Sequence, residues 1–153
     1  MTIVEQAIEI DAPPNEAFVF FVPQRMPYWY GAEMNCSLEL SGGDADFHAA
    51  QKVRIRGHFK GRLRAREISH TCVVTRYEIP RILEWRFEDV YGVRGLERWE
   101  LQPTDSGTRV TMRSEYQMHG RVAPIVDWLI TRHAIARRNR DYLARLRKLA
   151  ERR

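Results

Sequence analysis

The chain has 153 residues, 44% of them hydrophobic, which is enough for one domain with a substantial core. No apolar run approaches the roughly 20 residues that a membrane-spanning helix needs. The N-terminus has no basic region followed by an apolar core, so we expect no signal peptide. Cys36 and Cys72 stand alone and suggest no metal site, which favours a cytoplasmic protein with reduced thiols and no metal or cofactor.

The net charge of +5 is concentrated in two places. Residues 121–153 contain ten basic and three acidic residues. The second basic cluster consists of Lys52, Arg54, Arg56, Lys60, Arg62, Arg64 and Arg66. Two interpretations remain open: a solvated surface, or a docking surface for an anionic partner such as phospholipid headgroups, RNA or an acidic carrier protein. Like charges facing each other across a hairpin formed by this cluster, Arg54 and Arg56 opposite Arg62, Arg64 and Arg66, would favour a bound anion.

The N-terminal third of the chain predicts one strand and two short helices. Residues 3–10 alternate in polarity, as a strand with one apolar face does. Asp11 is placed to cap a helix over residues 14–22, and the prolines beside it suit a first helical turn. Residues 24–30 predict one more turn and contain the densest aromatic cluster in the chain.

Six further strands follow, separated by short turns. They are predicted at residues 33–40, 51–58, 62–79, 82–90, 96–102 and 108–119. Consecutive strands joined by short turns imply an antiparallel sheet.

The only long helical pattern lies at residues 122–150. At about 100° per residue, one apolar stripe is formed by Ile125, Leu129, Ala136, Leu143, Leu146 and Ala150. Arg132 and Asn139 fall inside this stripe. Either Arg132 extends its charged head to water along apolar surface, or both residues reach into an internal cavity and meet the polar end of a ligand.

Seven strands covered on one face by one helix make an α+β fold. Because a helix is about 10 Å wide, it cannot fill a wide curved sheet. The remaining space is either a solid core or a pocket for an apolar ligand, and we favour the pocket. Its predicted lining from the strands is Trp85, Phe87, Trp99, Met112, Tyr116 and Met118.

Several short motifs resemble a known superfamily. The segments are Ile8–Phe18, Pro27-Tyr-Trp29, Pro80–Trp85 and Gly107-Thr-Arg-Val110. In order and spacing they are similar to the START-like, polyketide cyclase/dehydrase (SRPBCC) superfamily over essentially the whole chain. The resemblance implies a helix-grip fold, with residues 1–153 as a single START-like domain. It also implies a hydrophobic cavity between the sheet and the C-terminal helix for lipids, polyketides, sterols or quinones.

No specific catalytic constellation is present in the sequence. There is no G-x-S-x-G, H-E-x-x-H or Gly-rich phosphate loop. Strand parity leaves Glu97, Asp89 and Tyr116 as candidates for acid–base chemistry, and a buried Glu97–Arg132 pair would favour an enzyme.

We therefore predict a binding protein that carries or sequesters an apolar small molecule. The alternatives are a polyketide cyclase/dehydrase-type enzyme and a docking module for RNA or membrane. The predicted ligand-contacting residues are Trp29, Trp85, Phe87, Glu97, Trp99, Met112, Tyr116, Met118, Leu129, Arg132 and Ala136.

Overall fold

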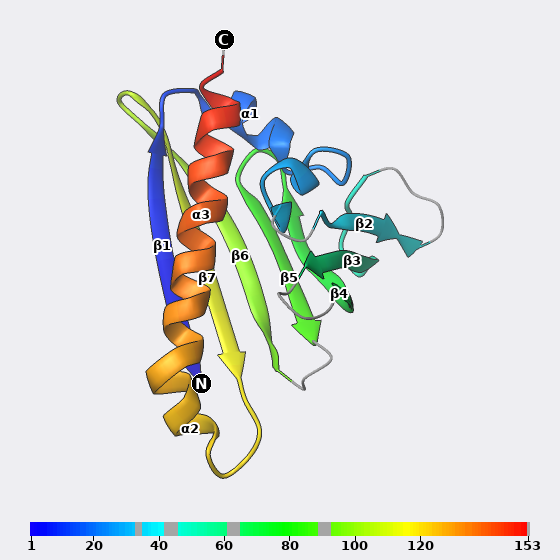
Figure 1. Ribbon diagram of the computed structural model, residues 1–153. Coiled ribbons are helices and arrows are strands. Elements are labelled where there is room, and N and C mark those ends of the chain that lie inside the picture. Colours follow the sequence, from blue (N-terminus) through cyan, green and yellow to red (C-terminus); the bar gives the residue numbers. More distant parts are fainter. Residues whose placement is uncertain (33–34, 42–45, 61–64, 89–92, 153) are drawn as a thin grey trace.

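The computed structural model describes residues 1–32, 35–41, 46–60, 65–88 and 93–152. Within them, seven strands form one antiparallel sheet in the order β1-β7-β6-β5-β4-β3-β2 (Figure 1). The strands are β1 (Thr2–Ile10), β2 (Ser37–Leu40), β3 (Lys52–Lys60), β4 (Ala65–Glu78), β5 (Ile82–Glu88), β6 (Arg94–Thr104) and β7 (Gly107–Gln117). The predicted α+β fold, a curved antiparallel sheet with one long C-terminal helix, is confirmed.

Two groups of helices lie on the inner face of this sheet. After β1 come α1 (Pro14–Ala17) and the 3-10 turns η1 (Phe18–Phe20) and η2 (Met26–Tyr28). After β7, α2 (Ala123–Val126), the π-helical segment η5 (Asp127–Thr131) and α3 (Arg132–Ala150) follow without a break and run alongside β1 and β7 (Figure 1). No helix among the described residues has the length and apolarity to cross a bilayer.

The predicted cap of the first helix is wrong. Pro13 occupies the N-cap position of α1, and no side chain caps this helix. The backbone N–H of Asp11 instead donates to Oε1 of Glu151 at 2.9 Å, which ties the start of the chain to the end of α3.

The predicted arrangement of the second basic cluster is also wrong. β3 continues to Lys60, past residue 58, where the strand was predicted to end, and it pairs with β4 from Ala65 onward. Arg54 therefore pairs with Thr71 and Arg56 with Ser69. Arg62 and Arg64 lie outside the described residues, and Arg66 pairs with Phe59. Because Arg54 and Arg56 face neutral residues across the hairpin, their repulsion gives no reason for a bound anion.

The inner face of β5 and β6 is covered by aromatic side chains from the η1–η2 region. Trp85 and Trp99 lie 5.0 Å apart between ring centroids. Tyr30 lies 5.5 Å from Trp85, and Trp29 lies 6.0 Å from Trp99, both edge to face. Such pairs add stabilisation beyond the apolar area they bury. The helix covers β1 and β7, and this aromatic cluster covers the centre of the sheet.

The predicted apolar stripe of the C-terminal helix is correct in one half and wrong in the other. Leu143 and Leu146 are buried, but Ile125 and Leu129 are 61% and 56% exposed. The π segment inserts one extra residue into the helix. The positions that face the sheet before this segment are therefore shifted by one residue relative to an uninterrupted α-helix. Ala123 and Asp127 therefore face the sheet in place of neighbouring apolar residues.

Asp127 holds the start of the C-terminal helix in this shifted orientation. Its Oδ2 accepts a hydrogen bond from the Thr2 hydroxyl at 2.6 Å and one from Nη2 of Arg132 at 3.2 Å. Its Oδ1 accepts a hydrogen bond from the Tyr116 hydroxyl. Burial alone would raise the pKa of this carboxyl, but the hydrogen bonds from Thr2, Tyr116 and Arg132 outweigh burial and lower it. Asp127 thus joins the helix to the start of β1 and the end of β7.

We expect Asp127→Asn to lower the free energy of unfolding by about 2–3 kcal/mol, because it removes a buried charged acceptor. The lowered pKa means that Asp127 stabilises the fold above its unfolded pKa and loses this effect as the pH falls through its folded pKa. Urea unfolding as a function of pH checks both statements. Asp141→Asn, on the exposed surface of α3, is the matched control and should change the free energy of unfolding little. Equal losses for the two variants would contradict this role.

Candidate functional site

Glu97 is a buried carboxylate in the middle of the sheet's inner face. It stands on β6 between Trp85 of β5 and Ser114 of β7, its partners in the strand register. Its side chain is only 4% exposed. Because a buried charge is costly unless it is paired, its neighbours decide what it can do.

A chain of polar side chains connects Glu97 to α3 and β7. Nη2 of Arg138 lies 3.5 Å from Glu97 Oε1, and its Nε donates to Oδ1 of Asn139 at 3.2 Å. Nδ2 of the fully buried Asn139 donates to the Ser114 hydroxyl at 2.9 Å. The Arg138 guanidinium also lies 5.4 Å from the ring centroid of Tyr142. Asn139 therefore bonds to a polar side chain inside the protein. Contact of Asn139 with the polar end of a ligand stays a prediction.

Two groups in this cluster have pKa values above their ordinary range. Burial raises the pKa of Glu97, although the charge of Arg138 and hydrogen bonding from Tyr30 and Arg138 oppose the shift. Burial also raises the pKa of the Tyr30 phenol well above its usual value, and the nearby charge of Glu97 adds to this. Both groups are thus harder to ionise here than in water.

Three buried polar atoms next to this cluster have no protein partner among the described residues. They are the indole Nε1 atoms of Trp85 and Trp99 and the Oε2 atom of Glu97. The three residues adjoin one another, since Trp85 contacts Trp99 and pairs with Glu97 across the strands. Each such atom costs roughly 1–3 kcal/mol when nothing replaces its lost water. Two donors and one acceptor are therefore available to a polar group that is not part of the chain.

Exposure of the inner face increases toward one end of the sheet. Trp85, Trp99 and Met112 are completely buried. One row further along the strands, Phe87 and Gly95 are partly exposed, although Tyr116 of the same row is buried. Met118, just beyond the end of β7, and Ala136 on the helix are also partly exposed. Glu97 thus lies between a densely packed aromatic half and a more open half of the inner face.

Of the remaining predicted ligand-contacting residues, Trp29 adjoins the cluster through Trp99, whereas Tyr116, Leu129 and Arg132 do not join it. Trp29 is fully buried in the aromatic cluster, where its Nε1 donates to the Phe20 carbonyl oxygen at 2.9 Å. Tyr116 and Arg132 both bind Asp127. Leu129 is more than half exposed. The Glu97–Arg132 pair that would have favoured an enzyme is not formed, because Arg132 binds Asp127 and Arg138 lies beside Glu97 instead. Asp89 lies outside the described residues.

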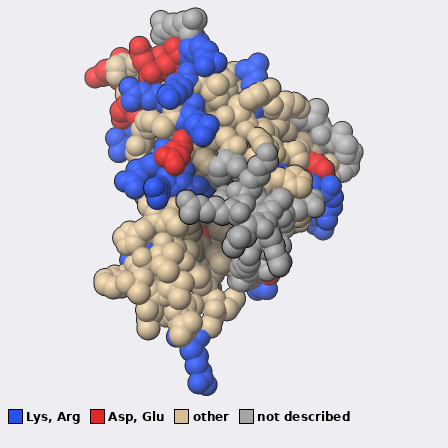
Figure 2. Space-filling view, in the orientation of Figure 1, with Lys and Arg blue, Asp and Glu red and all other residues tan. Residues whose placement is uncertain are grey.

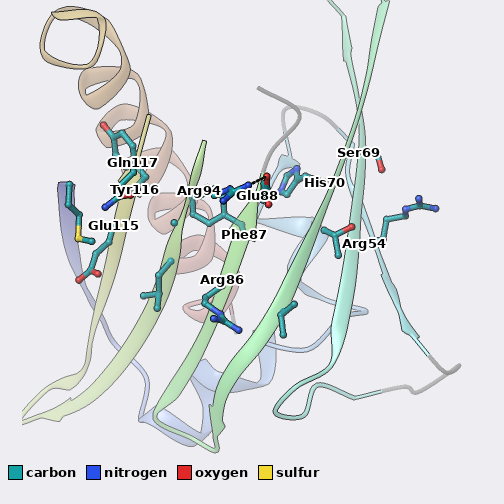
Figure 3. Close-up of a pocket in the computed structure, with 15 residues that line it drawn as sticks. Arg54, Ser69, His70, Arg86, Phe87, Glu88, Arg94, Glu115, Tyr116 and Gln117 are labelled. Carbon is teal, nitrogen blue, oxygen red and sulfur yellow. Dashed lines mark ion pairs between the residues drawn. The ribbon is translucent and has the colours of Figure 1, made fainter. Parts of the chain in front are cut away.

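A separate groove of about 910 Å³ lies largely along the outer face of the sheet. Arg86, Leu96 and Glu115 pair across β5, β6 and β7 and alternate with the buried inner-face residues. Figure 3 shows these strands with Arg54, Arg86 and Glu115 beside the groove, and Arg94 joined to Glu88 by an ion pair of 3.0 Å. Phe87 and Tyr116 also contribute to its lining. The groove mixes acidic and basic groups and does not contain the Glu97 cluster.

Sequence reasoning found Glu97 by strand parity but missed Tyr30, Ser114 and Arg138. Tyr30 and Ser114 carry no signal that separates them from ordinary core or strand residues. Arg138 precedes Asn139, which the helical periodicity did identify, but its link to Glu97 depends on the packing of α3.

The family of this chain follows from its sequence and agrees with the fold described above. The model of the family described as "Polyketide cyclase / dehydrase and lipid transport" matches residues 1–151. The chain belongs to this family. No functionally curated protein matches it significantly.

Solved structures with the same fold come from several bacteria. A protein from Chromobacterium violaceum has a TM-score of 0.75 and 12% identity, with 100% of both chains covered. A conserved protein from Geobacillus kaustophilus has a TM-score of 0.72 and 19% identity, covering 97% of this chain and 95% of its own. At these identities the similarity establishes the helix-grip fold, as the resemblance implied.

The raised pKa of Glu97 predicts how stability changes with pH. Over the range between its unfolded and folded pKa values, the folded state holds a proton that the unfolded chain has lost. The stability of the wild-type protein should therefore fall as the pH rises through this range. Glu97→Gln should flatten this decline in urea unfolding followed as a function of pH, because the variant has no carboxyl to titrate at this position. Glu100→Gln, on the other face of β6, serves as the control, and an unchanged slope in Glu97→Gln would contradict the prediction.

Proposed function

We propose that this protein binds a largely apolar small molecule of the lipid, polyketide, sterol or quinone class between the sheet and α3, as a carrier or sequestering protein. In this proposal residues 1–153 act as a single START-like ligand-binding domain. The observation that supports it is the group of three buried polar atoms of Trp85, Trp99 and Glu97 that find no partner in residues 1–32, 35–41, 46–60, 65–88 and 93–152. The family description, which includes lipid transport, agrees with it.

The cluster suits the polar end of such a ligand. The indole N–H groups of Trp85 and Trp99 donate to a ligand oxygen, and Oε2 of Glu97 forms a hydrogen bond with a ligand hydroxyl. The apolar part of the ligand extends toward Phe87, Met118 and Ala136, where the inner face is more open. Burial of apolar area at about 25 cal/mol per Å² supplies most of the affinity, and the few polar groups set the orientation.

A second function is favoured by the raised pKa of Glu97. Because burial raises the pKa of Glu97, its protonated form is favoured more than in water, and a carboxyl of raised pKa suits acid–base catalysis on a polycarbonyl chain. Arg138 beside it would stabilise negative charge that develops on a carbonyl oxygen. In that case Glu97→Gln would retain binding and abolish conversion of a polycarbonyl compound, measured by product analysis.

The binding proposal is tested with two probes that differ only in a hydroxyl group, 2-naphthol and naphthalene, by equilibrium dialysis. The wild-type protein should prefer 2-naphthol, because only this probe can engage the unpaired donors and acceptor. Trp85→Phe and Trp99→Phe remove one donor each and should weaken 2-naphthol binding by about fivefold to tenfold, with naphthalene binding little changed.

Trp29→Phe is the matched control, because its indole N–H is already paired with Phe20. It should reduce thermal stability but leave the preference for 2-naphthol intact. Equal binding of the two probes to the wild-type protein, or the same loss of preference in all three Trp→Phe variants, would refute the proposed site.

A further inference from the structure

A contiguous apolar surface protrudes at the start of the C-terminal helix. We call it the apolar corner, and it consists of Val122, Ile125, Val126, Trp128, Leu129 and Ile130. Their exposed fractions range from 36% to 66%. Large exposed apolar patches are rare on monomeric proteins and mark surfaces that contact another molecule or a membrane.

The apolar corner is a consequence of the helix geometry. Among residues 123–130 only Ala123 and Asp127 are buried, so this part of the helix is exposed around most of its circumference. The hydrogen bonds of Asp127 to Thr2 and Tyr116 hold it against the sheet. The exposed apolar side chains are thus presented by a fixed backbone.

The surroundings of the apolar corner are basic. Asp127 is the only acidic residue between positions 118 and 140 of the sequence, and it is buried and paired. The basic residues of this stretch with exposed or partly exposed side chains are His119, Arg121, Arg132, His133, Arg137, Arg138 and Arg140. Figure 2 shows an uncharged surface over α2 with basic side chains along α3 beside it.

We propose that the apolar corner docks on the surface of an anionic lipid bilayer. An exposed Trp beside Ile and Leu, bordered by Arg and His, is the composition of helices that lie in the membrane interface. The apolar side chains enter the boundary between headgroups and acyl chains, and the basic border contacts anionic headgroups. This inference concerns a surface distinct from the Glu97 cluster and does not depend on a bound ligand.

The charge pattern favours a lipid surface over other occupants. If two copies of this chain met symmetrically through the corner, Arg121 and Arg132 of both copies would approach with no exposed acidic side chain in this stretch to pair with them. RNA would satisfy the basic border but leave the aliphatic side chains in water.

Vesicle co-sedimentation tests the proposal directly. The full chain should sediment with vesicles of phosphatidylcholine containing 30% phosphatidylglycerol at low salt, and binding should weaken as salt is added and screens the charges. Binding to vesicles of phosphatidylcholine alone should be much weaker. Insertion should shift the fluorescence emission of Trp128 to shorter wavelength. The emission of Trp29, Trp85 and Trp99 should not change, because these three side chains are completely buried.

Ile130→Gln combined with Trp128→Gln should reduce partitioning onto the anionic vesicles at least about tenfold. Ile79→Gln is the matched control. Ile79 is 72% exposed but lies in the turn between β4 and β5, outside the apolar corner, and this change should have no effect. Three results would overturn the proposal: no sedimentation at low salt, equal loss in the double variant and the control, or a dimer that only the double variant dissociates. RNA binding without vesicle binding would overturn it as well.

Discussion

One buried carboxylate, Asp127, determines how the long helix meets the sheet. It accepts hydrogen bonds from Thr2, Tyr116 and Arg132 and faces the sheet only because the π segment shifts the helical phase by one residue. Beyond the segment, the same helix turns Asn139, Tyr142 and Leu143 inward. Before it, Trp128 and its apolar neighbours are left in solvent. The inner polar cluster and the apolar corner therefore share one structural cause.

The polar cluster is unusual because of where it lies. A sheet that buries Trp85, Trp99 and Met112 completely could have been closed with apolar residues at little cost. Instead it contains Glu97 with a raised pKa, linked through Arg138 and Asn139 to Ser114. Two indole N–H groups beside it have no partner within the part of the chain that the structure describes. A ligand with a polar end would satisfy all of these groups and so offset the stability they cost the free protein.

Much of the sheet could be predicted from the sequence, because alternation on a strand depends only on local geometry. Trp85, Glu97, Trp99, Met112 and Tyr116 do share the inner face, as strand parity predicted. Which of them contact a ligand stays a prediction.

The errors have a common physical origin in long-range packing. Extrapolating an ideal helix across residues 127–131 placed Ile125 and Leu129 in the core, because periodicity contains no sign of an inserted residue. The same extrapolation suggested Arg132 as the partner of Glu97, whereas Arg132 binds Asp127 and Arg138 reaches Glu97. The residues at which the β3–β4 hairpin turns likewise depend on the pairing of the two strands, which the turn residues alone do not determine.

The most direct test of the central claim is native mass spectrometry of the purified protein at neutral pH, followed by solvent extraction. The account predicts a bound organic molecule, largely apolar and with at least one oxygen, that is released when the chain is denatured. The mass of the 153-residue chain alone, both as purified and after incubation with excess 2-naphthol, would contradict it. In that case the inner face would be a solid core with an unusual polar cluster.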